Sequence, residues 1–151
     1  MKRIFIIFLI LLSNLSLAND LSFSKDNYYK SIIESNKMQK IADRTKKNGF
    51  FSALDRAEMI VVIENSLRYS NNVSDEFLDK TDISWFFNNH KNYYEKYFRE
   101  SLRMLLSYYK DKYSHENNYI VFDATKKMDK WSKFQNKLKK KHDGYFEIDS
   151  N

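Results

Sequence analysis

Residues 89–114, NHKNYYEKYFRESLRMLLSYYKDKYS, carry the clearest periodic pattern in the chain. Large apolar side chains recur in this stretch at intervals of three and four residues: Tyr94, Phe98, Leu102, Leu105 and Tyr109. That spacing gathers them on one face of an α-helix, because an α-helix makes one turn every 3.6 residues. We therefore predict a long amphipathic helix whose apolar face needs other helices to cover it.

The rest of the chain favours the same class of structure. It has two glycines, Gly49 and Gly144, and no proline among 151 residues. All-β proteins use these residues in their many turns, so their scarcity indicates a mainly α fold. We expect one domain, a small helical bundle of about four to five helices.

The segment before Gly49 predicts one helix that begins at an N-cap, Asp26, and ends at Lys47. Its apolar face shifts near Ser35-Asn36, which favours a kink or break at that point. Asn48-Gly49 then forms a typical helix end.

A second helix is expected to begin after Ser52 and to end near Ser70. Asp55 follows Ser52 at the spacing of a capping box. The middle of this segment, residues 59–63, is apolar on all sides and predicts the most buried element. Its β-branched residues leave a short buried strand as the alternative, although the flanking residues favour a helix.

The carboxyl-terminal part predicts a last helix, capped by Asp123 or Thr125, that ends near Lys141. Its apolar face consists of Ala124, Met128, Trp131, Gln135 and Leu138. Two flanking runs, residues 119–122 and 145–148, are rich in aromatic and β-branched side chains. They leave open one short β-ribbon near the carboxyl terminus, although two strands alone are marginally stable.

Residues 1–18 have the layout of a cleaved export signal. Two basic residues precede nine apolar ones, and Ser16 and Ala18 then fit the small-x-small pattern that signal peptidase accepts. The apolar run is about half as long as the roughly 20 residues that cross a bilayer, which disfavours an uncleaved anchor. We expect cleavage between Ala18 and Asn19, leaving residues 19–151 as a single helical domain, periplasmic or secreted.

The net charge and the expected export together limit the classes of partner that we expect. The chain has 26 basic and 20 acidic residues, and loss of the two basic residues in the signal leaves 24 against 20, a net charge of +4. Nucleic acid, a common partner of basic chains, is not expected for an exported protein. The expected partner is another envelope or secreted protein, with anionic lipid or cell-wall polymer as the alternative.

The chain lacks the residues of most catalytic and cofactor sites. It has no cysteine, and the spacing of His90, His115 and His142 puts no two of them on one helix face. It also has no glycine-rich loop for phosphates and no G-x-S-x-G nucleophile motif. We therefore expect no cofactor, no metal and no enzymatic activity.

One enzymatic alternative is retained. Glu34 and Glu100 each precede a serine on an expected helix, and lytic transglycosylases place their general acid in such a dipeptide. That role requires a buried glutamate with a raised pKa, which a dipeptide does not indicate. A peptidoglycan-cleaving enzyme is therefore the second alternative.

The last helix carries the most pronounced charge pattern. Lysines surround the face opposite its apolar residues: Lys126, Lys127, Lys130, Lys133, Lys137, Lys140 and Lys141. A basic amphipathic helix can lie on an anionic membrane or bind an acidic partner. A run of charges can equally do no more than keep a helix face in water.

The preferred interpretation is an exported, non-enzymatic protein-binding domain, such as a periplasmic inhibitor, an immunity-type protein or an envelope adaptor. The first alternative is a binder of anionic membrane or cell-wall surfaces that uses the basic last helix.

Overall fold

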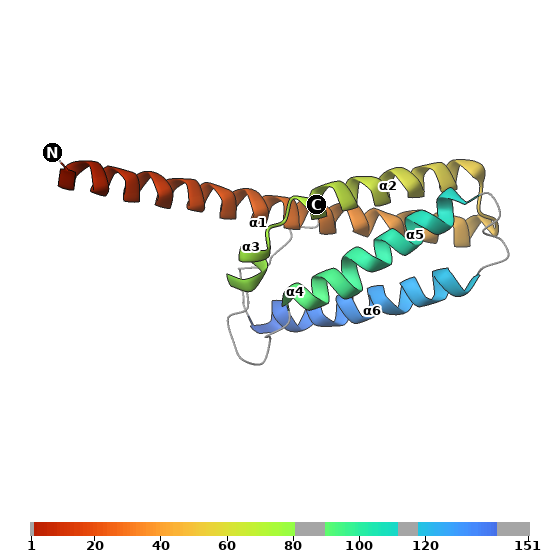
Figure 1. Cartoon of the computed structure of the whole chain (residues 1–151). Helices are drawn as coiled ribbons and strands as arrows, with labels where there is room; N and C mark the ends of the chain where they lie inside the picture. The colour runs from red at the N-terminus through yellow and green to blue at the C-terminus, as the bar shows by residue number, and fades with distance from the viewer. Residues whose placement is uncertain (1, 81–89, 112–117, 142–151) are drawn as a thin grey trace.

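The computed structural model describes the backbone of residues 2–80, 90–111 and 118–141, and the side chains of residues 20–79, 90–111 and 119–138. Every regular element in these ranges is helical (Figure 1). The prediction of a small, mainly α bundle is confirmed.

The first two helices, α1 (Lys2–Asn48) and α2 (Ala53–Asn71), form an antiparallel pair joined by a tight turn (Figure 1). Gly49 ends α1 with a φ of 77°, a conformation that glycine adopts without a Cβ clash. The predicted capping box of α2 is present: the Asp55 N–H donates to the Ser52 hydroxyl at 3.0 Å, and the Ser52 N–H donates to the Asp55 carboxylate at 2.9 Å.

Two expectations for α1 are wrong. The helix begins at Lys2 rather than at Asp26, and it passes through Ser35 without a break (Figure 1). Asp26 lies on the helix surface, where Lys30 one turn later donates to its carboxylate at 3.1 Å. The Ser35 hydroxyl donates to the Ile32 carbonyl at 2.8 Å, so a continuous helix accommodates it.

The middle of α2 is helical, which settles the helix-or-strand alternative, but it is not buried on all sides. Met59, Val62 and Ile63 are buried, whereas Val61 is 54% exposed. The next helix, α3 (Asp75–Lys80), is short, and Ser74 precedes it. The Phe77 N–H donates to the Ser74 hydroxyl at 3.2 Å.

The predicted long amphipathic helix is present from His90 to Lys110, in three consecutive parts. These are α4 (His90–Tyr93), the π-helical segment η2 (Tyr94–Arg99) and α5 (Glu100–Lys110). At the end of η2 the Glu100 N–H donates to the Glu95 carbonyl, five residues back. The Arg99 side chain then reaches the end of α2, where its Nε donates to the Ser70 hydroxyl at 2.8 Å.

The last helix, α6 (Asn118–Lys141), corrects the strand prediction for residues 119–122, which form its first turn. The intrinsic preference of β-branched residues for strands spans about 1 kcal/mol, and packing readily overrides it. The Thr125 hydroxyl donates to the Val121 carbonyl at 2.7 Å within the helix, so Thr125 is not its N-cap. The second strand candidate, residues 145–148, lies outside the described residues.

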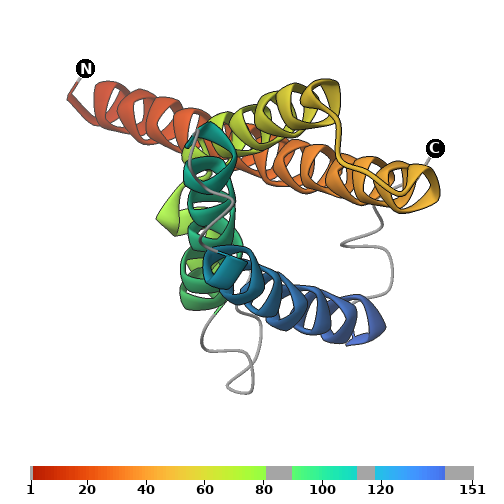
Figure 2. The ribbon, with the colours of Figure 1, turned by 90° about the vertical axis from the view of Figure 1, so that its right-hand side faces the viewer.

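The core lies where the helices meet. α1 packs on α2, α2 on α5, and α5 together with η2 on α6. Seen along the bundle in Figure 2, these contacts leave α1 and α6 facing each other at its open side. The most buried large side chains are mainly aromatic and aliphatic: Tyr28, Ile32, Ile41, Ile63, Leu78, Tyr94, Phe98, Leu102 and Leu138.

Candidate binding site

At one end of the bundle, aromatic rings join α1 to α6. The rings of Tyr28 and Trp131 lie edge to face with their centroids 6.4 Å apart. His90 stacks on Trp131 at 6.1 Å with an interplanar angle of 9°. Its Nε2 and the Tyr28 hydroxyl are hydrogen-bonded at 3.0 Å. We call this cluster of Tyr28, His90 and Trp131 the closed end.

Burial controls the ionisation of the closed end. It lowers the pKa of His90 to about 4, because a charged imidazole would lose its hydration. Burial, and to a smaller degree the nearby Tyr94, raises the pKa of Tyr28. Both groups are therefore neutral near pH 7, and their role there is to pack and to share a hydrogen bond.

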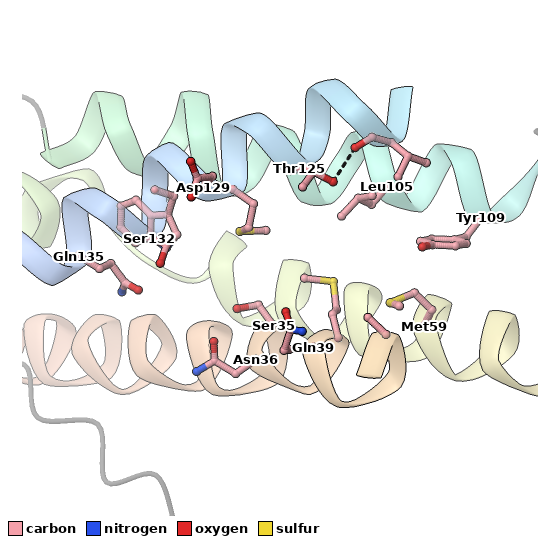
Figure 3. A pocket seen from close by; sticks show the side chains of 15 residues that line it. Ser35, Asn36, Gln39, Met59, Leu105, Tyr109, Thr125, Asp129, Ser132 and Gln135 are labelled. Atoms are coloured by element: carbon pink, nitrogen blue, oxygen red, sulfur yellow. Dashed lines mark hydrogen bonds between the residues drawn. The ribbon is translucent and has the colours of Figure 1, made fainter. Parts of the chain in front are cut away.

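Beyond the closed end, α1 and α6 are separated by a groove of about 530 Å³. Its floor includes Met59 of α2, Leu105 of α5 and Met128 of α6. In Figure 3, Gln135 and Ser132 of α6 lie across the groove from α1. The rims thus carry mostly neutral polar side chains, and the floor is apolar.

The sequence of α1 explains why the groove stays open. On this side α1 presents Asn36, Gln39 and Ala42, all of them exposed. Alanine is too short to reach α6. The two amides stay at the rim, where water can reach them and where Gln39 Nε2 donates to the Asp43 carboxylate at 2.8 Å. A long apolar side chain at these positions would instead be driven against Met128 and Leu105.

Four of the predicted lysines form a row on the outer surface of α6. Lys126, Lys130, Lys133 and Lys137 are all exposed and follow each other at intervals of four, three and four. That spacing puts them on one helix face, which we call the lysine face. Lys127 lies about 100° away, and its ammonium pairs with Glu100 of α5 at 3.0 Å with the side chain 18% exposed.

The lysine face contacts another helix at Lys130, whose Nζ lies 5.3 Å from the centroid of the Tyr97 ring of η2. Lys133 pairs with Asp129 on the same helix at 2.6 Å. Lys126 Nζ lies 4.3 Å from the centroid of the Phe122 ring. The backbone of α6 continues through Lys140 and Lys141, but their side chains lie outside the described residues.

Sequence reasoning missed two exposed aromatic residues on this face. Tyr119 is 73% exposed and Phe122 is 57% exposed. They precede Lys126 by seven and four residues, and so extend the lysine face toward the start of α6. Because residues 119–122 were predicted as a strand, Tyr119 and Phe122 were not recognised as sharing a helix face with Lys126. In a strand, successive residues point to alternate sides of the chain.

The glutamates of the enzymatic alternative lie on different helices. Glu34 of α1 pairs with Lys37 at 2.6 Å, and Glu100 of α5 pairs with Lys127. Among the residues with described side chains, no group of three or more His, Asp or Glu is arranged to hold a metal ion. His115 and His142 lie outside the described residues.

Ala18 and Asn19, the predicted cleavage position, lie within the backbone of α1, and their side chains are not among those described. From Asp20 onward, where side chains are described, no helix is long and apolar enough to cross a bilayer. Comparison with protein-family models, curated proteins and solved structures finds no match for this chain.

Proposed function

We propose that this protein is an exported, non-enzymatic binding protein that accepts an amphipathic helix of another envelope or secreted protein in the groove between α1 and α6. The observation that carries the proposal is the groove itself, with its apolar floor and mostly neutral polar rims. Helix-in-groove recognition needs these two features, because the floor takes the apolar face of the partner and the rims border its polar face.

The dimensions and the floor suit such a partner. The groove residues of α6 run from Val121 to Gln135, which corresponds to about 21 Å of helix at 1.5 Å per residue. A partner helix of about four turns matches this length. Met38, Met59 and Met128 all line the groove, and flexible thioether side chains adapt to apolar faces of differing shape.

The position of the expected cleavage supports export. The amino-terminal part of α1, red in Figure 1, extends beyond the other helices. The first buried side chain described on α1 is Ser24, several residues after Asn19. Loss of residues 1–18 would therefore leave the described core intact, and the released protein would be periplasmic or secreted.

Filling the groove tests the binding site. Ala42→Trp places a large ring in the groove, whereas Ala57→Trp makes the same change at an exposed alanine of α2 that does not line it. The partner is first captured from envelope extract and purified, and its affinity for both variants is then measured by calorimetry. We expect Ala42→Trp to weaken binding by at least tenfold and Ala57→Trp to leave it unchanged. Equal affinity of the two variants would exclude the groove.

Processing is tested on the protein made from its whole reading frame. The mass of the protein recovered from the periplasm or medium should correspond to a chain that begins at Asn19. Ala18→Arg should block this cleavage, because signal peptidase requires a small residue there. A wild-type protein that keeps Met1 and stays in the cytosol would refute export.

The lysine face favours a second candidate function, the binding of anionic lipid or cell-wall polymer. Four lysines in one row outside the core are the supporting observation. Replacing all four by glutamine should abolish salt-sensitive binding to an anionic surface, because exposed charges are screened within about 10 Å at 0.1 M salt. Binding of the wild type and of the quadruple variant is measured on anionic vesicles and on isolated cell wall. Equal binding of the two proteins would exclude this candidate.

A further inference from the structure

Exposed apolar side chains are concentrated at the end of the bundle opposite the amino-terminal extension of α1. Eight large hydrophobic residues are exposed among those described, and five of them belong to the α1–α2 turn, the first turn of α2 or the start of α6. These five are Phe50, Phe51, Leu54, Tyr119 and Phe122, with exposures between 42% and 75%. We call them the apolar tip. These segments lie at the right-hand end of Figure 1.

The fold holds the α1–α2 part of the tip in place. Gly49 makes the turn, and the Ser52–Asp55 capping box fixes the start of α2. The Phe51 ring lies 5.6 Å from that of Tyr109, and Arg56 Nε donates to the Tyr109 carbonyl at 2.6 Å. The turn is thus anchored to α5, so presenting Phe50 and Leu54 costs little further ordering on binding.

Positive charge borders these apolar side chains. Lys46 and Lys47, both exposed, end α1 directly before the turn that presents Phe50. The nearby carboxylates of Asp55 and Glu58 both pair with Arg44, each at 2.5 Å. Arg44, Lys46 and Lys47 together thus exceed these two carboxylates by one positive charge, and the two lysines, which lie nearest the turn in sequence, complement an anionic surface.

We propose that the apolar tip docks on an anionic phospholipid bilayer, with Phe50 and Leu54 entering the interface and Lys46 and Lys47 at the phosphates. The exposure of these side chains favours a bilayer over a protein, because Phe50 is 63% exposed and Leu54 is 75% exposed at one end of the bundle. A bilayer interface takes up exposed apolar side chains without a matching cavity, which a protein partner would need. Lysines bordering apolar side chains are typical of interfacial anchors. The proposal does not depend on the groove.

The experiment uses protein purified from cells that express the whole reading frame, and two vesicle types. One is phosphatidylcholine, and the other contains one third phosphatidylglycerol. Phe50→Ser with Leu54→Ser removes the apolar side chains of the tip. Phe23→Ser with Ile33→Ser is the matched control on α1, where the two side chains are 58% and 43% exposed.

We expect the wild type and the control to bind phosphatidylglycerol vesicles in co-sedimentation, and the tip variant to bind at least tenfold more weakly, since it loses two apolar side chains from the interface. Lys46→Gln with Lys47→Gln should weaken binding by a similar factor, because each lysine near an anionic surface contributes attraction. Lys133→Gln with Lys137→Gln, on the lysine face, should weaken it less.

Three results would overturn the proposal. These are no preference of the wild type for phosphatidylglycerol, equal weakening by the tip variant and its control, and a loss of binding confined to the Lys133 and Lys137 variant. The last result would assign the contact to the lysine face.

A second measurement tests the proposal even if the tip variant fails to fold. Because the chain has no cysteine, a fluorophore sensitive to polarity can be attached at a single introduced one. The label on Phe50→Cys should brighten and shift to the blue with anionic vesicles, and the label on Phe23→Cys should not. An unchanged signal at position 50 would also overturn the proposal.

Discussion

The two halves of the space between α1 and α6 differ in what fills it. At the closed end, Tyr28, His90 and Trp131 span the distance between the helices. Two to four turns further along α1, Asn36, Gln39 and Ala42 leave a groove over methionine and leucine side chains. A cavity therefore arises here from a change of side-chain size along one helix, without any change in the path of the backbone.

The closed end and the turn between α1 and α2 are also held by different forces. The closed end relies on ring packing, which excludes water from a neutral hydrogen bond. At the other end, the turn between α1 and α2 relies on hydrogen bonds and ion pairs, among them Ser52 with Asp55 and Arg44 with Asp55. The closed end should consequently dominate stability, and the turn should contribute increments of about 1 kcal/mol.

The largest expected effect comes from Trp131→Ala. This side chain is 2% exposed and contacts rings from α1, η2 and α6. Removing it should lower the free energy of unfolding by about 3–5 kcal/mol. Met128→Ala, one turn earlier on the groove floor, should cost about 1 kcal/mol, because Met128 is only partly buried and water can occupy the vacated space. Urea denaturation measures both, and equal losses would contradict the distinction between the closed end and the groove.

The next effect is acid sensitivity of the closed end. In the unfolded chain His90 takes up a proton near pH 6.5, but burial lowers its pKa in the folded protein to about 4. Between these values the unfolded state binds more protons. Stability should thus be complete above about pH 6.5 and decline toward pH 4, by up to about 3 kcal/mol from this group.

His90→Gln provides the comparison, because glutamine can hydrogen-bond to Tyr28 but does not titrate. The variant should lose less stability than the wild type between pH 7 and pH 4.5 in urea denaturation. Parallel pH profiles for the two proteins would show that His90 does not carry the effect.

The smallest expected effect belongs to the turn. Ser52→Ala removes the hydroxyl of the capping box and should cost about 1 kcal/mol at neutral pH. Hydrogen bonds from Ser52, followed by Arg44, lower the pKa of Asp55 to about 2 from an ordinary 3.8. The contribution of Asp55 is therefore present above about pH 4 and is lost as the pH falls through 2, a more acidic window than that of His90. If Ser52→Ala steepens the loss of stability between pH 6.5 and 4, this separation of the two windows is wrong.

Local signals in the sequence predicted much of the fold. The three-four spacing of Tyr94, Phe98 and Leu102 identified the side chains that are fully buried. Gly49 and the Ser52–Asp55 pair identified the turn, because helix ends depend on a few neighbouring residues. The burial of His90 could also have been predicted from the sequence, because His90 precedes Tyr94 by one turn on the same helix face.

Features that depend on tertiary packing were missed. Residues 119–122 have β-branched and aromatic side chains, yet they form a turn of α6. The groove depends on how α6 lies relative to α1, and no periodicity within either helix encodes that distance. The lysines of α6 were identified from the sequence, but the aromatic residues that extend their face depended on the correct secondary structure.

The continuity of α1 has a consequence for the order of events during biogenesis. The peptide bond between Ala18 and Asn19 lies inside the helix. Proteases act on locally unfolded chain, so this bond can be cut only while the surrounding turns are unwound. Were residues 1–18 removed as proposed, cleavage would have to come before α1 winds and docks on α2, and a polypeptide that folds too early would keep these residues.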